Sequence, residues 1–482
     1  MKRIITTSLL GITAVSTFGA TATSPNIVII FMDDMGYGDL GVTGAKAYKT
    51  PNIDRLAHEG VLCTQFYVAQ AVSSASRAGL LTGCYPNRIG FQGALSPTSN
   101  VGISDDEMTL AQLLKQKNYT CGIFGKWHLG HHRQFLPLQH GFDEYLGLPY
   151  SNDMLPLWYD GTPLSPENST NRKASFPVLP LIEGNEKVKE LHTLEDQSQL
   201  TTLYTERAVS FIRKNRDKPF FLYLPHSMPH TPLSVSSKFK GKSERGLYGD
   251  VMMEIDWSVG QIMATLKELN LDENTLIIFT SDNGPWLNFG DHAGSAAGLR
   301  EGKGTAWEGG QRLPCIMRWK GVIRKGQICN RLISAIDIFP TLAFLCNAPL
   351  PPNKIDGINI WPLIAGETET SPRSYFLYYF DANHLKAVRN ERWKLVLPHT
   401  YRSYEGNLPG KDGFPGETSQ KTVKEIELYD LHRDPGERYD VKMLYPDVVE
   451  ELLKVVEDAR DDLGDAITSR EGKGRRPIGK LN

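Results

Sequence analysis

Four short apolar runs, each followed at once by polar residues, constrain the fold of this chain more than any other feature. They consist largely of β-branched or aromatic residues and occupy residues 26–31, 120–124, 220–224 and 276–279. Continuous apolar runs of this length are typical of strands buried on both faces of a mainly parallel sheet. Because parallel strands end at the same edge of such a sheet, we expect the polar residues after the runs to share one site.

Helical patterns lie between these runs. Residues 110–117 are amphipathic, and residues 248–269 place apolar side chains at helical spacing. Strands that alternate with helices predict an α/β domain. Later in the chain, short strand-like pieces and an amphipathic stretch over residues 448–463 predict a smaller α+β subdomain with an antiparallel sheet. The strand-like pieces are residues 375–380, 384–389, 393–397 and 427–431.

These patterns divide the chain of 482 residues into four parts. We expect a signal peptide over residues 1–22, a catalytic domain over 23–368, a C-terminal α+β subdomain over 369–465 and a mobile tail over 466–482. The signal is indicated by a positively charged start, an apolar stretch and a small-residue site at Ala20-Thr21-Ala22. The protein is therefore expected to be exported, periplasmic or secreted, with no membrane span.

The overall charge and the cysteines narrow the choice of partners. A net charge of -2 gives no general attraction to nucleic acid or to an anionic membrane, so an anionic substrate needs local basic residues. The six cysteines lack the paired spacing of a metal site. Export permits disulfides, and buried free thiols are an equal alternative.

A Ser-rich stretch with one arginine is the first candidate for chemistry. Residues 73–83 read SSASRAGLLTG. Ser73 precedes a short apolar turn, so it can lie at a helix N-terminus, where backbone N–H groups favour anionic chemistry. Arg77 follows about one helical turn later and can stabilise a charged oxygen there. The alternative is a Ser-rich loop that caps a helix.

Carboxylates and an amide follow two of the apolar runs. Asp33 and Asp34 come after the first run, and Asp282 and Asn283 come after the last. Such an all-oxygen set suits a hard cation such as Ca²⁺ or Mg²⁺. Without a cation, the converging acids would raise one another's pKa values. The alternative is that each pair forms a separate turn or cap.

Three further stretches carry basic side chains. Residues 125–130 contain Lys126 and His128, two apart after a strand, so both can face one cavity. A Pro-rich loop contains His226 and His230, and a Gly-rich stretch over residues 298–310 contains Lys303. Taken singly, each is more often a surface or structural group than part of a site. His226 in particular is as consistent with a structural role as with a functional one.

Together these motifs resemble, in kind and in order, those of the formylglycine-dependent sulfatases of the alkaline phosphatase-like superfamily. The similarity is greatest to the arylsulfatase A and N-acetylgalactosamine-6-sulfatase branch. It implies a large α/β/α sandwich with a mixed, mainly parallel sheet and a C-terminal α+β subdomain. It also implies one metal ion, usually Ca²⁺ with Mg²⁺ as the alternative.

The resemblance assigns roles to individual residues. The implied catalytic residues are Ser73, Arg77, Lys126, His128, His230 and Lys303. The implied metal ligands are Asp33, Asp34, Ser73, Asp282 and Asn283. The implied substrate-binding residues are Lys126, His230, Lys303 and, with less support, His226.

A serine stands at position 73, where many members of the family have a cysteine. The resemblance therefore implies the bacterial serine-type route, in which a radical S-adenosylmethionine maturase oxidises the side chain to formylglycine. An unmodified serine would stop at a stable sulfate ester, so turnover is expected to depend on this modification.

The expected function is hydrolysis of sulfate esters on sulfated glycans, with galactose or N-acetylgalactosamine sulfates as the expected substrates. One alternative is a phosphomonoesterase or phosphodiesterase that uses unmodified Ser73, and another is a non-catalytic binder of sulfated glycans. Substrate contacts are expected from the irregular stretch over residues 148–191. Further candidates for such contacts are His131, His132, Arg133, Trp286 and His292.

Overall fold

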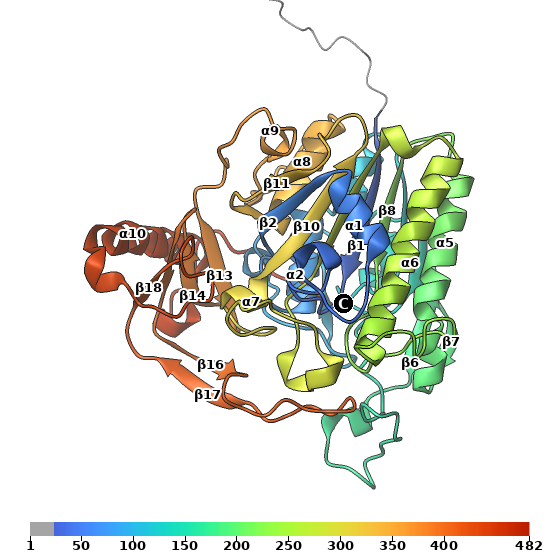
Figure 1. Ribbon diagram of the computed structural model, residues 1–482, viewed down its shortest axis with the longest axis horizontal. Coiled ribbons are helices and arrows are strands. Elements are labelled where there is room, and N and C mark those ends of the chain that lie inside the picture. Colours follow the sequence, from blue (N-terminus) through green and yellow to red (C-terminus); the bar gives the residue numbers. More distant parts are fainter. Residues whose placement is uncertain (1–23, 482) are drawn as a thin grey trace, which may run out of the picture.

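The computed structural model describes residues 24–481, and the predicted signal peptide lies outside them. An 11-stranded mixed sheet forms the centre of the large unit (Figure 1). Its middle is four parallel neighbouring strands, which confirms the predicted α/β class. In sheet order they are β9 (Thr275–Ser281), β1 (Asn26–Met32), β8 (Phe220–Pro225) and β4 (Thr120–Phe124).

Further strands extend the sheet on both sides. Beside β9, β10 (Arg312–Trp319) runs antiparallel to β9 and to β2 (Val61–Tyr67), and two short strands pair with β2. These are β11 (Gln327–Cys329) and β12 (Ile333–Ser334). Beside β4 come β5 (Glu144–Gly147), β6 (Leu179–Glu183) and β7 (Glu186–Leu191).

The hairpin β6–β7 differs from the expectation of an irregular stretch over residues 148–191. Five of the six β7 residues are exposed, so this edge strand has no apolar alternation for the sequence to reveal. Its pairing with β6 rests mainly on backbone hydrogen bonds.

Helices cover both faces of the sheet, as the alternation along β1 requires. Ile27, Ile29 and Phe31 pack in one apolar cluster, whereas Val28 and Ile30 pack in another. The first cluster includes residues of α2 (Ser73–Thr82), α3 (Leu110–Lys115) and α8 (Ile338–Leu345). The second includes residues of α1 (Pro51–His58), α5 (Leu200–Lys214) and α6 (Leu247–Glu268). The result is a three-layer α/β/α sandwich (Figure 1).

The C-terminal unit is built on a four-stranded antiparallel sheet, as predicted. Its strands are β13 (Phe376–Phe380), β14 (His384–Arg389), β15 (Trp393–Val396) and β18 (Glu427–Asp430). Helix α10 (Pro446–Leu463) packs on this sheet, and a separate hairpin pairs β16 (His399–Ser403) with β17 (Ser419–Val423) (Figure 1). Tyr67 and Trp307 of the large unit share an apolar cluster with this subdomain.

Three short α-helices complete the α-helices of the described part. They are α4 (Leu194–Ser198), α7 (Glu308–Gln311) and α9 (Trp361–Ile364). Among residues 24–481, no helix has both the length and the apolar character needed to cross a membrane. All six cysteines lie in this range, where they are buried and reduced.

The C-terminal segment is docked on the large unit, in contrast to the mobile tail that we expected. Strand β19 (Gly479–Lys480) pairs with β3 (Val101–Gly102), and Arg476 forms hydrogen bonds of 2.6 and 2.8 Å with the carboxylate of Glu107. The sequence of this segment is basic and polar, but its charges find partners that lie far away in the chain.

Candidate active site

The parallel register brings the acidic motifs together. Met32 lies beside Ser281 in adjacent strands, so the residues that follow them emerge side by side. The backbone N–H of Asp34 donates to Asp282 Oδ1 at 3.2 Å. Asn283 Nδ2 donates to Asp34 Oδ1 at 2.7 Å. The two pairs therefore form one cluster and not separate turns.

Helix α2 points its first turn at this cluster. The N-cap is Val72, so Ser73 is the first helical residue and its side chain does not cap the helix. Instead, Ser73 Oγ donates to Asp33 Oδ1 at 3.1 Å. One turn later, Arg77 Nη2 donates to Asp282 Oδ2 at 2.8 Å and lies 3.4 Å from Asp33 Oδ2.

Lys126 links the acids to Ser73. It follows β4, and its Nζ lies 2.5 Å from Asp33 Oδ2, 3.3 Å from Ser73 Oγ and 3.1 Å from Ser151 Oγ. His128 is also buried beside the cluster, and its Nε2 bonds the carbonyl of Leu95 at 2.8 Å. A carbonyl only accepts, so Nε2 carries the proton and Nδ1, which has no partner, is an acceptor.

Lys303 and His230 approach the cluster from the other side. Lys303 Nζ lies 2.8 Å from Asp34 and 4.3 Å from the ring centre of Trp286. His230 Nε2 lies 3.6 Å from Asp34 Oδ2, and its ring centre is 5.5 Å from that of Trp286. Both basic side chains thus lie beside the carboxylate of Asp34.

Charge compensation decides the protonation of the buried acids. Burial would raise the pKa of Asp33, but Lys126 and the neighbouring cations hold it well below its usual range. Burial and the nearby carboxylate of Asp33 raise the pKa of Asp282 to about 6. Burial lowers the pKa values of His128 and His230, aided by Lys126 and Lys303 respectively.

The donor set fits a hard cation. Side-chain atoms of Asp33, Asp34 and His230 lie within 4.8 Å of one another, so the three groups could hold one ion. Asn283 Oδ1 is buried and has no hydrogen-bond partner, although it is a good ligand atom for Ca²⁺. Carboxylate and amide oxygens dominate the cluster, which matches the preference of Ca²⁺ and Mg²⁺.

His226 does not join the other predicted residues. It is fully buried, with Nε2 3.1 Å from Ser258 Oγ in α6 and its ring centre 6.4 Å from that of Tyr204 in α5. Its neighbours therefore belong to the helical layer.

The expected substrate contacts are also divided. Trp286 flanks Lys303 and His230, as described above, whereas Arg133 forms an exposed ion pair with Glu186. His131 and His132 lie with their ring centres 4.1 Å apart, and His292 packs against the chain at Gly413.

Three polar residues near the site were not singled out by the sequence. Ser151 bonds Lys126, and Asp153 lies 4.0 Å from the Nζ of Lys173. Burial would raise the pKa of Asp153, but His230 and the nearby lysines lower it to about 2. All three lie in the stretch over residues 148–191, where we expected substrate contacts, but no local pattern marks them.

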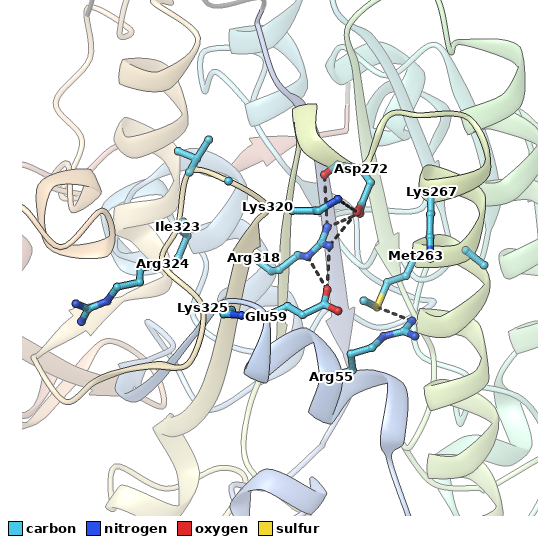
Figure 2. Close-up of a pocket in the computed structure, with 13 residues that line it drawn as sticks. Arg55, Glu59, Met263, Lys267, Asp272, Arg318, Lys320, Ile323, Arg324 and Lys325 are labelled. Carbon is cyan, nitrogen blue, oxygen red and sulfur yellow. Dashed lines mark hydrogen bonds and ion pairs between the residues drawn. The ribbon is translucent and has the colours of Figure 1, made fainter.

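A cavity of about 870 Å³ lies at the opposite edge of the sheet, between α1, α6 and the end of β10 (Figure 2). Its buried cation, Arg318, points at Glu59 and Asp272 and is neutralised by both (Figure 2). Asp272 precedes β9, whereas Asp282 follows it, so about 20 Å of strand separates this cavity from the acidic cluster.

The fold and this cluster define an enzyme of the alkaline phosphatase-like class, with an α/β/α sandwich and an acidic site at the ends of its parallel strands. The family described as "Sulfatase" matches residues 25–348, and "C-terminal region of aryl-sulfatase" matches residues 371–476. The chain belongs to the sulfatase family and is a sulfuric ester hydrolase, as the sequence motifs predicted.

Individual relatives agree with this assignment. The chain is 38% identical to N-acetylgalactosamine-6-sulfatase of Mus musculus over 472 residues, which cover 91% of this chain and 86% of the relative. It is 37% identical to arylsulfatase A of Bos taurus, with 91% and 87% covered. Among solved structures, the PsFucS1 sulfatase from Pseudoalteromonas sp. superposes with a TM-score of 0.81 at 30% identity, over 95% of this chain and 92% of that one.

Proposed function

We propose that this chain hydrolyses sulfate esters of sulfated glycans through a formylglycine formed from Ser73. The observation that carries the proposal is the position of Ser73. Ser73 is the first residue of helix α2, and its side chain is buried. Its Oγ lies within hydrogen-bond distance of the carboxylate of Asp33 and of the ammonium of Lys126. A nucleophile held there faces anion-stabilising groups from the start of the reaction.

Two groups that the polypeptide does not encode complete this site. Oxidation of Ser73 by the maturase would supply an aldehyde, and addition of water to that aldehyde would give the diol whose oxygen attacks sulfur. A Ca²⁺ ion, with Mg²⁺ as the alternative, would supply positive charge toward the sulfate oxygens when bound. Asp33, Asp34, Asp282 and Asn283 would hold it together with the side chain at position 73.

The remaining residues bind charge and move protons. Lys126 and Lys303 neutralise the sulfate oxygens as charge develops on them. Arg77 pairs with Asp282 and Asp33, which holds both carboxylates in place beside the start of α2. Asp282 accepts the proton of the attacking hydroxyl at position 73.

The two histidines serve opposite ends of the reaction. His230 lies beside Asp34, and its protonated form gives its proton to the departing sugar oxygen, which leaves as the hydroxyl. His128 presents an unpaired Nδ1 acceptor and takes the proton of the second hydroxyl at position 73, which leads to release of sulfate. Sulfate release regenerates the aldehyde at position 73.

The substrate class and the biological setting are also proposals. The names of the relatives, such as N-acetylgalactosamine-6-sulfatase, support a sulfated galactose or N-acetylgalactosamine. The serine at position 73 calls for a radical S-adenosylmethionine maturase as partner. The basic and apolar start of the sequence supports export to the periplasm or the medium.

Mass spectrometry and activity assays test the proposal together. Chain produced with a serine-type maturase should carry a position-73 peptide lighter by two hydrogens and should release sulfate from sulfated monosaccharides. Chain produced without the maturase should carry serine and release none. Phosphate release by the unmodified chain would instead support a phosphatase, and sulfate binding without turnover by the modified chain would support a binding protein.

A further inference from the structure

A second cavity, of about 930 Å³, lies where the C-terminal subdomain meets the Gly-rich loop of the large unit. Gly304 forms one wall, β14 supplies Lys386, and the hairpin β16–β17 supplies His399 and Arg402. Figure 1 shows this hairpin beside the C-terminal sheet. Apart from Gly304, every lining residue belongs to the C-terminal part of the chain, so the large unit closes only one side of the cavity.

This cavity adjoins the catalytic cluster through the backbone. Gly304 follows Lys303 directly, and its N–H donates to the carbonyl of Ala71 at 2.9 Å. Ala71 precedes Ser73 by two residues, a separation of at most about 7.6 Å along the chain. The wall formed by Gly304 therefore lies close to position 73. It is within reach of the sugar that neighbours the one whose sulfate ester is hydrolysed.

The lining of the cavity is strongly basic. Its acidic member is the exposed Asp381, against five cationic or imidazole side chains. Those side chains are His384, Lys386, His399, Arg402 and Lys424. Lys386 is 2% exposed, and its Nζ has a carbonyl acceptor, that of Thr400, at 3.3 Å. Arg402 bonds the carbonyl of Lys303, while its Nε is buried without a partner.

His399 adds a hydrogen-bond acceptor to this basic lining. Its Nδ1 lies 2.7 Å from the carbonyl of Leu397, so Nδ1 carries the proton. Nε2 is buried without a partner and is left as an acceptor in the neutral ring. Burial lowers the pKa of His399 to about 4, which keeps the ring neutral near pH 7. A sugar hydroxyl is a suitable donor to this atom.

We propose that this cavity binds the neighbouring sugar of the substrate chain, and that this sugar carries a second anionic group. Lys386 and Arg402 bind that group, which is a sulfate or a carboxylate, and His399 accepts from a hydroxyl of the same sugar. The proposal rests on the proposed sulfatase function and makes the enzyme selective for polyanionic oligosaccharides. The cavity in Figure 2 does not fit this role, because Arg318 is already neutralised there.

Lys386→Met and Lys424→Met test this assignment with matured enzyme. The first removes a buried charge at similar length, and the second removes an exposed one, so at least the second is expected to fold. Lys421→Met is the matched control, because Lys421 lies on β17 but pairs with Glu405 and does not line the cavity. Each variant is assayed on a sulfated monosaccharide and on disaccharides whose second sugar carries sulfate, carboxylate or no charge.

We expect Lys386→Met to lower kcat/KM for the doubly anionic disaccharides by about tenfold or more, the usual effect of one charge-assisted hydrogen bond. Lys424→Met should lower it by a smaller factor. The kcat/KM values for the monosaccharide and the neutral-neighbour disaccharide should change by less than about twofold in every variant, because neither substrate places an anion in this cavity. The sulfate and carboxylate substrates show which anion the cavity prefers. Equal losses on all substrates, or no loss on any, would overturn the proposal.

A binding measurement separates this proposal from the sulfatase function itself. Chain with unmodified Ser73 is titrated calorimetrically with the same disaccharides, so no turnover is needed. Weaker binding of the doubly anionic ligands by Lys386→Met, with unchanged binding by Lys421→Met, supports the cavity even if no sulfate is released. Equal affinities of Lys386→Met and the parent chain contradict it.

Discussion

Arg77 Nη2 donates to Asp282 Oδ2 at 2.8 Å, and both side chains are fully buried although 205 positions separate them in the sequence. Removal of the arginine leaves the buried Asp282 without its ion-pair partner, whereas Asp33 keeps Lys126. We therefore expect Arg77→Met to lower the free energy of unfolding by about 3–5 kcal/mol, the usual cost of breaking a buried ion pair. Urea unfolding measures this loss, and kcat/KM for sulfate release should fall with it.

Arg133→Met is the control for that variant. Arg133 pairs with Glu186 at the surface, where both side chains are more than two thirds exposed. Its removal should change stability by less than about 1 kcal/mol. A similar loss of stability in the two variants would show that the buried ion pair of Arg77 contributes no more than an exposed one.

Calcium should stabilise the folded chain through Asn283. A ligand present at 100 times its Kd adds about 2.7 kcal/mol to the free energy of unfolding. We expect thermal unfolding to shift upward when Ca²⁺ is added and downward when a chelator removes it. Asn283→Ala should lose most of this shift, because it removes the buried, unpartnered Oδ1.

Asn215→Ala provides the comparison for the calcium effect. Asn215 is equally buried, but its Nδ2 bonds the carbonyl of Phe211 at the end of α5. This variant should keep the full Ca²⁺-dependent shift. An unchanged shift in Asn283→Ala would remove Asn283 from the proposed ligand set.

His226 should make the protein less stable in acid. Burial lowers the pKa of this histidine from 6.5 to about 3. Below pH 6.5 the unfolded chain binds a proton at His226 and the folded chain does not, so stability falls as the pH falls from 6.5 toward 3. Between pH 7 and pH 5 this linkage costs about 2 kcal/mol. His226→Gln should lose that part of the pH dependence in urea unfolding.

The control for His226 is His58→Gln, at an exposed position on α1. It should follow the parent chain at both pH values. Parallel pH profiles for the parent and His226→Gln would show that the buried imidazole does not resist protonation.

The docked C-terminal segment should contribute to stability through Arg476. Its guanidinium bonds Glu107, whose side chain is 4% exposed and would lose its partner in Arg476→Met. We expect a loss of about 1 kcal/mol, discounted because Arg476 itself is partly exposed to solvent. Arg475→Met is the matched control, since Arg475 bonds carbonyl groups and no carboxylate. If both variants unfold at the same urea concentration as the parent, the segment is not held by this ion pair.

The central sheet was predictable because its strands carry their own signal. β1, β4, β8 and β9 are buried on both faces, so each appears in the sequence as a continuous apolar run. β10 gave no such signal, because Arg312, Pro314 and Arg318 interrupt its apolar run. β7 gave none because it is an exposed edge strand.

The site was predictable where its residues belong to short motifs with several polar or glycine residues close together in the chain. Lys126 and Lys303 fall in such motifs, and the structure brings both to the acidic cluster. Ser151, Asp153 and Lys173 lie in an irregular stretch, and only the packing of that stretch against the strand ends gives them a common location.

The sequence by itself determined the four buried strands, the acids at their ends and the serine at the start of α2. These features depend on residues that are close together in the chain. Only the tertiary structure decided between His226 and His230, which share one Pro-rich loop but face α6 and Asp34 respectively. The docked tail and the basic cavity beside Gly304 were likewise decided by packing, because their contacts join segments more than 80 residues apart.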